Sequence, residues 1–303
     1  MSLHLTVLGS NAAKPTHGRF TSSQVLKQND RLYLIDCGEG CQIRLSQYKI
    51  KRNRIEAIFI SHLHGDHLFG LPGVLTSFFH FNRSSKLQII GPVGLREYIE
   101  TTMRLSQSHL NSPVEIKEVI ATSLTPVFET TQLEVFAFPL KHRIETNGYI
   151  FKEKMPVANI MKEKIEELNL SIEEIKLLKT STDVTRPDGT IIHHQDVLTQ
   201  KYSPKSYAYC SDTVYDESIV PYIKEVDLLY HETTYLDELR DKAEERKHST
   251  AKEAALIAKL ADVKALMIGH YSGKYRDVEP LRLEAEHYFS TVYAAYDGFM
   301  IEV

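Results

Sequence analysis

The sequence has 303 residues, of which 42% are hydrophobic and 25% charged, and its formal net charge is −4. This is the composition of a globular protein with a sizeable core, and the negative charge excludes a protein that holds nucleic acid by bulk positive charge. Three cysteines (Cys37, Cys41, Cys210) are too few for a disulfide framework or a four-thiolate zinc site.

The chain opens without a basic segment ahead of a long apolar run, and no apolar run approaches the roughly 20 residues that span a bilayer. We therefore expect a cytoplasmic protein with no membrane partner.

Strand-like and helix-like patterns alternate along most of the chain. The sequence predicts strands at 3–9, 22–28, 31–38, 54–61, 86–91, 114–120, 133–142, 206–212, 226–232 and 264–270. It predicts helices at about 39–48, 66–81, 93–105, 249–260 and 279–289, with Asp66 as the N-cap of the second. This mixture indicates an α/β fold. The segment of about 152–205 is mostly polar and helical, and we interpret it as an inserted arm.

The stretch FISHLHGDHLFGLPGVL carries three histidines and an aspartate within six residues: His62, His64, Asp66 and His67. A predicted strand ends just before them, so one tight turn would hold imidazoles and a carboxylate close together. These groups are good zinc ligands. A polar loop that only makes hydrogen bonds is the other interpretation, but it rarely concentrates such residues at this spacing.

Three more candidate ligands each follow a predicted strand. His142 follows VFAFPLK, Asp212 follows YAYCS, and His270 follows ALMIG. Sites in α/β proteins lie just beyond the carboxyl ends of the strands. The sequence therefore predicts that these residues complete the metal site.

Together these residues resemble the ligand pattern of the metallo-β-lactamase superfamily. Three further stretches resemble one of its families, ribonuclease Z: GLPGVLTS after the histidines, HETT at 231–234, and HST at 248–250. The resemblance implies an αββα sandwich, with one hydrolase domain over residues 1–303 and the arm at about 152–205. It further implies a zinc-dependent endoribonuclease, working as a homodimer, that removes the 3′ trailer from precursor tRNA and leaves a 3′ hydroxyl.

The same resemblance assigns roles to individual residues. It implies two zinc ions per chain, one bound by His62, His64 and His142, the other by Asp66, His67 and His270, with Asp212 bridging both. Asp66 would also act as catalytic base; alternatively it is only a ligand. His248 would protonate the departing 3′ oxygen, with Glu232 orienting it. The alternative is that His248 caps the helix beginning near Ser249 and Glu232 pairs with a surface base.

Two segments depart from the family pattern. In KPTHGRF (14–20), His17 and Phe20 stand where the family's Pro-x-Lys-x-Arg-Asn loop has lysine and asparagine, so the exact cleavage position is open. The arm lacks the family's Gly-Pro pair, and residues 152–205 hold nine Lys and Arg against nine Asp and Glu. The arm could bind tRNA or could instead support a dimer.

Two other functions stay open. One is another phosphodiesterase of the same superfamily, acting on cyclic nucleotides or small phosphodiesters. The other is a metal-bearing RNA-binding protein without turnover, which the complete ligand set disfavours. Asp36, at the end of the strand LYLID, is a candidate to support the histidine loop from behind the ligands.

Overall fold

The computed structural model describes residues 3–80, 83, 85–108, 113–155, 159–199 and 203–303. They form two compact units. The larger unit comprises residues 1–129, 134–152 and 205–303, and the smaller comprises 130–133 and 153–204.

The first sheet of the larger unit has seven strands in the order β16-β1-β2-β3-β4-β5-β6. The bounds are β1 Leu3–Gly9, β2 Ser23–Gln28, β3 Arg31–Ile35, β4 Ile55–Phe59, β5 Leu87–Gly91, β6 Val114–Glu118 and β16 Met300–Glu302. Strands β3 to β6 run parallel to one another, whereas β1 pairs antiparallel with β2 and β16.

The second sheet also has seven strands, in the order β15-β14-β13-β12-β9-β8-β7. The bounds are β7 Thr125–Glu129, β8 Leu133–Leu140, β9 Thr146–Glu153, β12 Ser206–Cys210, β13 Leu228–Glu232, β14 Leu266–Gly269 and β15 Val292–Ala294. Strands β12 to β15 are parallel. Each sheet therefore has a block of parallel strands, whose carboxyl ends share one edge.

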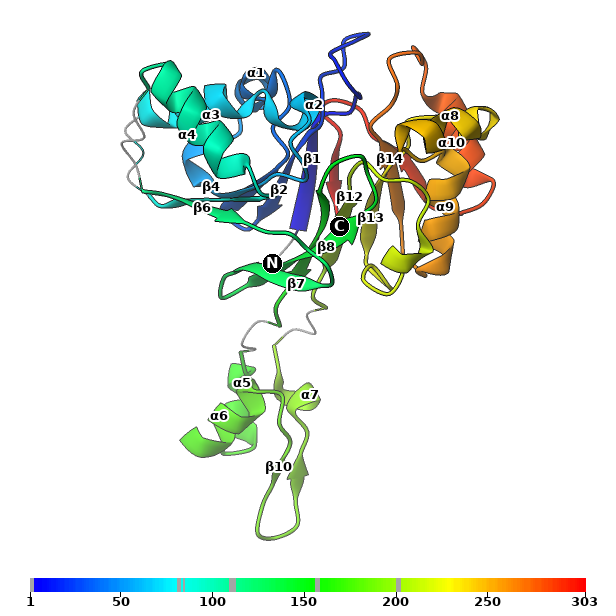
Figure 1. The fold of residues 1–303 in the computed structure, drawn as a ribbon. Coiled ribbons are helices and arrows are strands. Elements are labelled where there is room, and N and C mark those ends of the chain that lie inside the picture. Colours follow the sequence, from blue (N-terminus) through cyan, green and yellow to red (C-terminus); the bar gives the residue numbers. More distant parts are fainter. Residues whose placement is uncertain (1–2, 81–82, 84, 109–112, 156–158, 200–202) are drawn as a thin grey trace. The chain divides into compact units, whose positions relative to one another are not determined.

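Helices cover the two sheets on their outer faces, as Figure 1 shows for α3 and α4 on one side and α9 and α10 on the other. Their bounds are α1 Cys41–Gln47, α2 Gly65–Leu68, α3 Leu71–His80, α4 Leu95–Leu105, α8 Arg240–Arg246, α9 Ala251–Leu260 and α10 Glu279–Glu286. Three short 3-10 helices lie at Arg52–Arg54, Glu217–Ile219 and Asp237–Leu239. Each helical layer packs a separate hydrophobic core against its own sheet.

Aromatic side chains fill the space between the two sheets. The ring of Phe59 in β4 meets Tyr149 and Phe151 of β9 edge to face, at centroid distances of 5.4 and 5.1 Å. The hydroxyl of Tyr207 in β12 donates to Gln24 in β2. Helix, sheet, sheet and helix thus form four layers, as the αββα prediction requires.

The smaller unit has a core of its own. Its elements are α5 Lys162–Glu167, α6 Ile172–Lys179, β10 Val184–Thr185, β11 Ile191–Ile192 and α7 His194–Val197. Buried apolar residues hold them together: Ile160, Leu170, Leu178, Val184, Ile192 and Val197. Ser171 and Glu174 form a capping box at the start of α6.

The predicted helix beginning at Asp66 is wrong in its detail. The segment forms two helices, α2 and α3, and the N-cap of α2 is His64, so Asp66 lies in the first turn. The helix is interrupted at Gly70, because the Gly70 N–H donates to the carbonyl of Cys37. The backbone approaches closely here: a Cβ on residue 70 would lie 2.1 Å from the Gly38 carbonyl oxygen. The predicted end at residue 81 lies outside the described residues.

All ten predicted strands are present, with ends within three residues of those expected. The sequence prediction missed β7, β9, β15, β16, the two short strands of the smaller unit, and helices α5 to α8 as separate elements. Among the described residues, no helix combines the length and the apolar character needed to cross a bilayer.

Candidate metal centre

The candidate ligands gather where strands of both sheets end. His62 follows β4, Asp212 follows β12, and His270 follows β14 directly; His142 follows β8, two residues beyond its end. The turn after β4 then enters α2, which carries Asp66 and His67. Hence all seven predicted ligands lie together at one edge of the sandwich.

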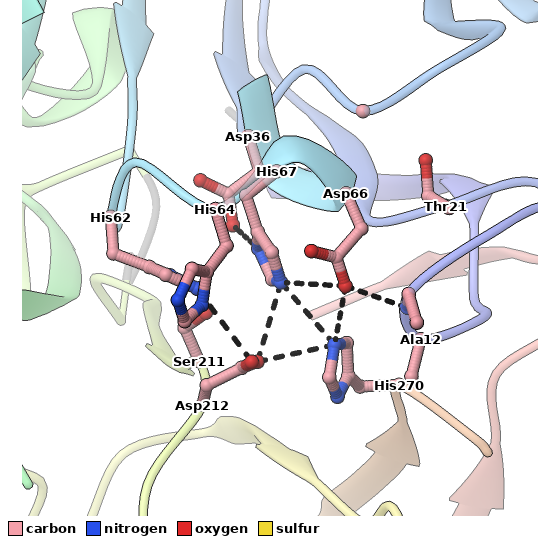
Figure 2. Close-up of polar contacts among 12 residues, drawn as sticks. Ala12, Thr21, Asp36, His62, His64, Asp66, His67, Ser211, Asp212 and His270 are labelled. Atoms are coloured by element: carbon pink, nitrogen blue, oxygen red, sulfur yellow. Dashed lines mark hydrogen bonds and ion pairs between the residues drawn. The ribbon is translucent and has the colours of Figure 1, made fainter. Parts of the chain in front are cut away.

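These seven residues form two groups that share Asp212. His62, His64, His142 and Asp212 each offer a donor atom within 4.8 Å of the others, and Asp66, His67 and His270 do the same. The two Asp212 oxygens face different groups. Its Oδ2 lies 3.6 Å from His62 Nε2, whereas Oδ1 lies 3.3 Å from His67 Nε2 and 3.2 Å from His270 Nε2 (Figure 2). Oδ2 also lies 3.8 Å from His142 Nε2.

In two of the histidines, a hydrogen bond at the ring nitrogen that faces away from Asp212 determines that the nitrogen facing Asp212 carries no proton. His142 Nδ1 lies 2.7 Å from the Lys247 carbonyl, and His67 Nδ1 lies 2.7 Å from Asp36 Oδ2. Because a carbonyl or carboxylate accepts only, Nδ1 carries the proton in a neutral ring and Nε2 offers a lone pair.

The inward lone pairs fit a cation. His67 Nε2 and His270 Nε2 lie only 3.2 Å apart, and so do His142 Nε2 and His64 Nδ1. Buried His62 Nε2 and Asp212 Oδ1 have no hydrogen-bond partner among the described residues. Lone pairs that converge with buried carboxylates, without donors between them, are what metal ligands require.

Asp36 supports the histidine loop from behind, as the sequence suggested. Its Oδ2 accepts from His67 Nδ1, from Ser61 Oγ at 2.8 Å and from the Tyr209 hydroxyl at 2.6 Å, and its Oδ1 accepts from Ser61 N at 2.7 Å. Asp36 is fully buried, so these contacts fix the orientation of the His67 ring.

The electrostatic field of the site favours bound positive charge. Burial lowers the pKa of His62 well below its ordinary value, and the nearby His67 lowers it further. At His67 itself burial also opposes the charged form, but the carboxylates of Asp212, Asp66 and Asp36 raise the pKa well above its ordinary value. A site that attracts a proton this strongly also attracts a metal cation, and the two compete for the same nitrogen.

His248 and Glu232 form a pair beside the ligands. Glu232 is fully buried, and its Oε1 accepts from His248 Nδ1 at 2.9 Å. The helix that follows is capped by Thr250, which forms a capping box with Glu253. The alternatives of His248 as helix cap and Glu232 as partner of a surface base are therefore wrong.

Three backbone N–H groups and one hydroxyl hold Glu232 in place. Its Oε1 accepts from Ser249 N at 3.0 Å and Thr213 N at 3.3 Å, and its Oε2 accepts from Thr234 N at 3.0 Å and Thr234 Oγ1 at 2.8 Å. Burial opposes the protonated His248 ring, yet the Glu232 carboxylate raises the pKa of His248 to about 9. The His248 ring is thus protonated on both nitrogens, and positively charged, at neutral pH.

A cavity of about 370 Å³ opens over these groups. Asp66, Asp212, His248 and His270 line it together with other residues of the site. Asp66 Oδ2 is held by the N–H of Ala13 at 2.7 Å. A phosphodiester bound here would meet the ligand groups and the His248 ring at once.

The 14–20 loop lies against the loop after β14. His17 Nε2 lies 3.0 Å from the Gly273 carbonyl, and the Arg19 guanidinium donates to the carbonyls of Tyr275 and Arg276. Phe20 packs against Arg44, whose guanidinium carbon lies 4.3 Å from the ring centroid. The two residues that depart from the family pattern are thus part of a well-connected loop.

Sequence reasoning missed several residues that hold the site. Thr234 Oγ1 contacts both Glu232 and His270 Nδ1, the latter at 3.0 Å, and the Lys247 carbonyl positions His142. The second threonine of HETT was a visible signal for Thr234. A backbone carbonyl carries no signal in the sequence at all.

The chain matches known proteins over nearly its full length. A family model described as Anti-Pycsar protein Apyc1 matches residues 3–288. A curated relative named Ribonuclease Z, from Porphyromonas gingivalis, is 42% identical over 297 residues, which cover 98% of each chain.

Solved structures agree with this likeness. The short form of human tRNase Z has a TM-score of 0.71 and 29% identity, with 98% of each chain covered. The metallo-β-lactamase fold protein YhfI from Bacillus subtilis has a TM-score of 0.70 with all of both chains covered, and at 20% identity it shows the fold alone. The predicted αββα sandwich of the metallo-β-lactamase type is therefore confirmed.

Proposed function

Because this chain belongs to the ribonuclease Z family and to the family described as Anti-Pycsar protein Apyc1, we propose that it is a zinc-dependent endoribonuclease that removes the 3′ trailer from precursor tRNA. Membership of this family shows that the protein is a nuclease, that is, a phosphodiester hydrolase. The observation that carries the proposal is the buried Glu232–His248 pair directly beside the shared ligand Asp212, whose Oδ2 lies 3.9 Å from His248 Nδ1.

The donor set supports zinc at both groups. Imidazole nitrogens and carboxylate oxygens suit this metal. One ion would be held by His62, His64 and His142, the other by Asp66, His67 and His270, with Asp212 shared between them. Two such ions, when bound, supply Lewis acidity and lower the pKa of a coordinated water.

Asp66 is the proposed base. Its carboxylate lines the cavity, and the Ala13 N–H holds Oδ2, so the group has a fixed direction. Burial opposes its charge, but the imidazoles of His67 and His270 lower the pKa of Asp66 below its ordinary value. It is therefore ionised at neutral pH, and it can orient the attacking water and accept its proton.

His248 is the proposed acid. Glu232 binds its Nδ1, which leaves the Nε2–H to donate to the 3′ oxygen as the bond from that oxygen to phosphorus breaks. The tRNA then ends in a 3′ hydroxyl and the trailer begins with a 5′ phosphate. Glu232 touches no substrate in this scheme; it positions His248 and stabilises its charge.

The smaller unit is proposed to bind tRNA. Its charges balance overall, but many are used internally: Arg186 pairs with Glu174, and Lys164 pairs with Glu167. Lys176 and Lys179, in the last turn of α6, have no ion pair or hydrogen bond within the described part of the chain. Residues three apart share one helix face, so two free lysines lie together there.

The protein is further proposed to be a cytoplasmic homodimer, as the family resemblance implies. The smaller unit exposes apolar side chains such as Ile172, which is 67% exposed. Such a surface is compatible with a subunit or RNA contact. Sedimentation of the purified chain over a range of concentrations tests the dimer.

The test of the function is direct. The zinc-loaded protein is incubated with a 3′-extended precursor tRNA, and the cut and its end groups are mapped to the nucleotide. Cleavage beside the discriminator base, with a 3′ hydroxyl on the tRNA, is the expected result. Absence of cleavage together with rapid turnover of a cyclic nucleotide would favour the alternative, a phosphodiesterase for small substrates.

A further inference from the structure

Three residues of the cavity wall have no part in the scheme above. Phe69, Arg143 and Arg246 line the cavity together with Asp66 and His248. Each is exposed, so none contributes to a hydrophobic core. Their chemistry, one aromatic face and two guanidinium groups, is the chemistry with which proteins bind single-stranded nucleic acid.

Phe69 presents its ring beside the metal ligands. It is 65% exposed, although it follows directly on the helix that carries Asp66. The ring lies over Gly65, where a Cβ would come within 2.2 Å of Phe69 Cε2, so the glycine makes room for it. The Phe69 N–H bonds the Gly65 carbonyl at 2.8 Å, which fixes the backbone beneath the ring.

Arg143 and Arg246 carry free positive charge. Neither guanidinium has an ion pair or hydrogen bond to another described residue, whereas that of Arg44 binds Asp297 at 2.6 Å. Arg143 follows the ligand His142, and Arg246 precedes His248 by two residues. Both are therefore placed to bind phosphates close to the one that is cleaved.

The direction of the RNA follows from the proposed acid. His248 protonates the 3′ oxygen that stays with the tRNA, so the last tRNA nucleotide lies on the His248 side. His270 separates His248 from Asp66: its ring centroid is 5.5 Å from that of His248, and its Nε2 is 3.4 Å from Asp66 Oδ2. Phe69 lines the cavity beside Asp66, away from the departing 3′ oxygen, and we therefore assign the first trailer nucleotide to this side.

We propose that Phe69 stacks on the first base of the trailer, while Arg143 and Arg246 bind the phosphates that flank the scissile one. This inference rests on the proposed function. A stack needs only the face of a base, so the contact accepts trailers of any sequence. It would hold the trailer, which keeps the phosphate, in place while the 3′ oxygen of the tRNA departs.

The stacking contact is tested with Phe69→Leu, which keeps apolar bulk but removes the ring, and with Phe69→Tyr, which keeps it. We expect Phe69→Leu to lower kcat/KM on precursor tRNA by about 5- to 150-fold, the range for loss of one base–aromatic stack, and Phe69→Tyr to stay near the parent. On a precursor whose first trailer nucleotide is abasic, the parent and Phe69→Leu should be equal, because no base remains to stack.

Each other outcome rejects part or all of this assignment. If an abasic last tRNA nucleotide removes the difference instead, the trailer-side assignment is wrong. If Phe69→Leu cuts intact precursor as well as the parent does, the stacking role is wrong although the proposed function stands. If the parent itself does not cut precursor tRNA, the proposed function fails first and the assignment fails with it.

The arginines are tested through salt. Arg143→Gln and Arg246→Gln should each reduce the slope of log(kcat/KM) against log[salt] by about 0.7, the value for one lost phosphate contact on a single strand. Arg104 is a matched control, since it is exposed, lies in a different surface pocket and has no side-chain partner among the described residues. Slopes that change no more than with Arg104→Gln would show that neither arginine binds phosphate.

Discussion

The polar groups at the sheet edge and those of the smaller unit are held in opposite ways. At the edge, Asp36, His67 and Glu232 are fully buried, and Asp36 and Glu232 each accept several hydrogen bonds. In the smaller unit, Asp183 joins His193 with side chains 41% and 57% exposed. Buried networks fix geometry at a high cost if one member is lost, whereas exposed pairs contribute little to stability. The edge is therefore suited to chemistry, and the smaller unit to adaptable binding.

The strongest test of the edge removes its shared carboxylate. Asp212→Ala should lose bound zinc, because the mutual repulsion of two cations is then no longer reduced by a carboxylate between them. Activity should fall to background on precursor tRNA and on bis-(p-nitrophenyl) phosphate alike. Elemental analysis gives the zinc content per chain, and circular dichroism confirms folding.

Asp30→Ala is the control for this change, since that side chain is 87% exposed and lies outside the site. It should keep metal and activity. Two zinc ions retained per chain in Asp212→Ala would refute the shared-ligand assignment.

The second test separates proton delivery from metal binding. His248→Ala should keep its zinc yet slow RNA cleavage by about 10²–10⁴-fold, the usual contribution of a positioned acid. A substrate that releases nitrophenolate needs no protonated leaving group, so its hydrolysis should change far less. Glu232→Gln should also slow RNA cleavage more than nitrophenolate release, but by a smaller factor. The His248 ring stays in place, but without the Glu232 carboxylate its pKa falls and a smaller fraction of it is charged.

Equal losses on the two substrates would mean that His248 is structural. The sheet edge would then contain metal ligands and the residues that support them, but no proton donor for the leaving group.

The sequence could predict the ligands because each follows a strand or lies in one short motif. Strand ends are local features, and parallel strands bring them to one edge without further information. His142, Asp212 and His270 were found in this way, far apart in the chain but adjacent in space.

Asp36 was predicted as a support of the histidine loop, but most of the other supporting contacts could not be predicted, because they join segments that are far apart in the sequence. Tyr209 of β12 donates to Asp36 beyond β3, a pairing set only by how the two sheets face each other. The break between α2 and α3 at Gly70 also depends on a tertiary contact, here within the first sheet, because Gly70 lies against the Gly38 carbonyl beyond β3. The local pattern of 66–81 is helical throughout, and tertiary packing overrides it.

The third test concerns the smaller unit. Replacing both Lys176 and Lys179 by Gln should raise the KM for precursor tRNA several-fold and reduce the salt slope by about 1 for each lysine that contacts a phosphate. kcat and the hydrolysis of small phosphodiesters should stay unchanged, because a contact that binds substrate and transition state equally affects KM alone. Lys164→Gln is the matched control, since Lys164 already pairs with Glu167. An unchanged KM at low salt would show that this face does not bind tRNA.

The smallest effect is expected from the exposed cluster of the smaller unit. Asp183 accepts from His193 Nδ1 at 2.8 Å and from the His194 N–H at 2.9 Å. The hydrogen bond to Asp183 raises the pKa of His193, and the same bond lowers the pKa of Asp183.

Each shift gives a pH limit to the stability of this cluster. A raised histidine pKa stabilises the fold below the unfolded value of about 6.5, and this contribution is lost as the pH rises through the folded value. A lowered aspartate pKa stabilises the fold above about 3.9, and that contribution is lost as the pH falls. The cluster should therefore protect the β10–β11 hairpin most between about pH 4 and 6.5. Amide exchange of Ile192, corrected for its intrinsic rate, should accelerate above this range in the parent but not in Asp183→Asn, and equal profiles in the two proteins would show that the cluster has no part in holding the hairpin.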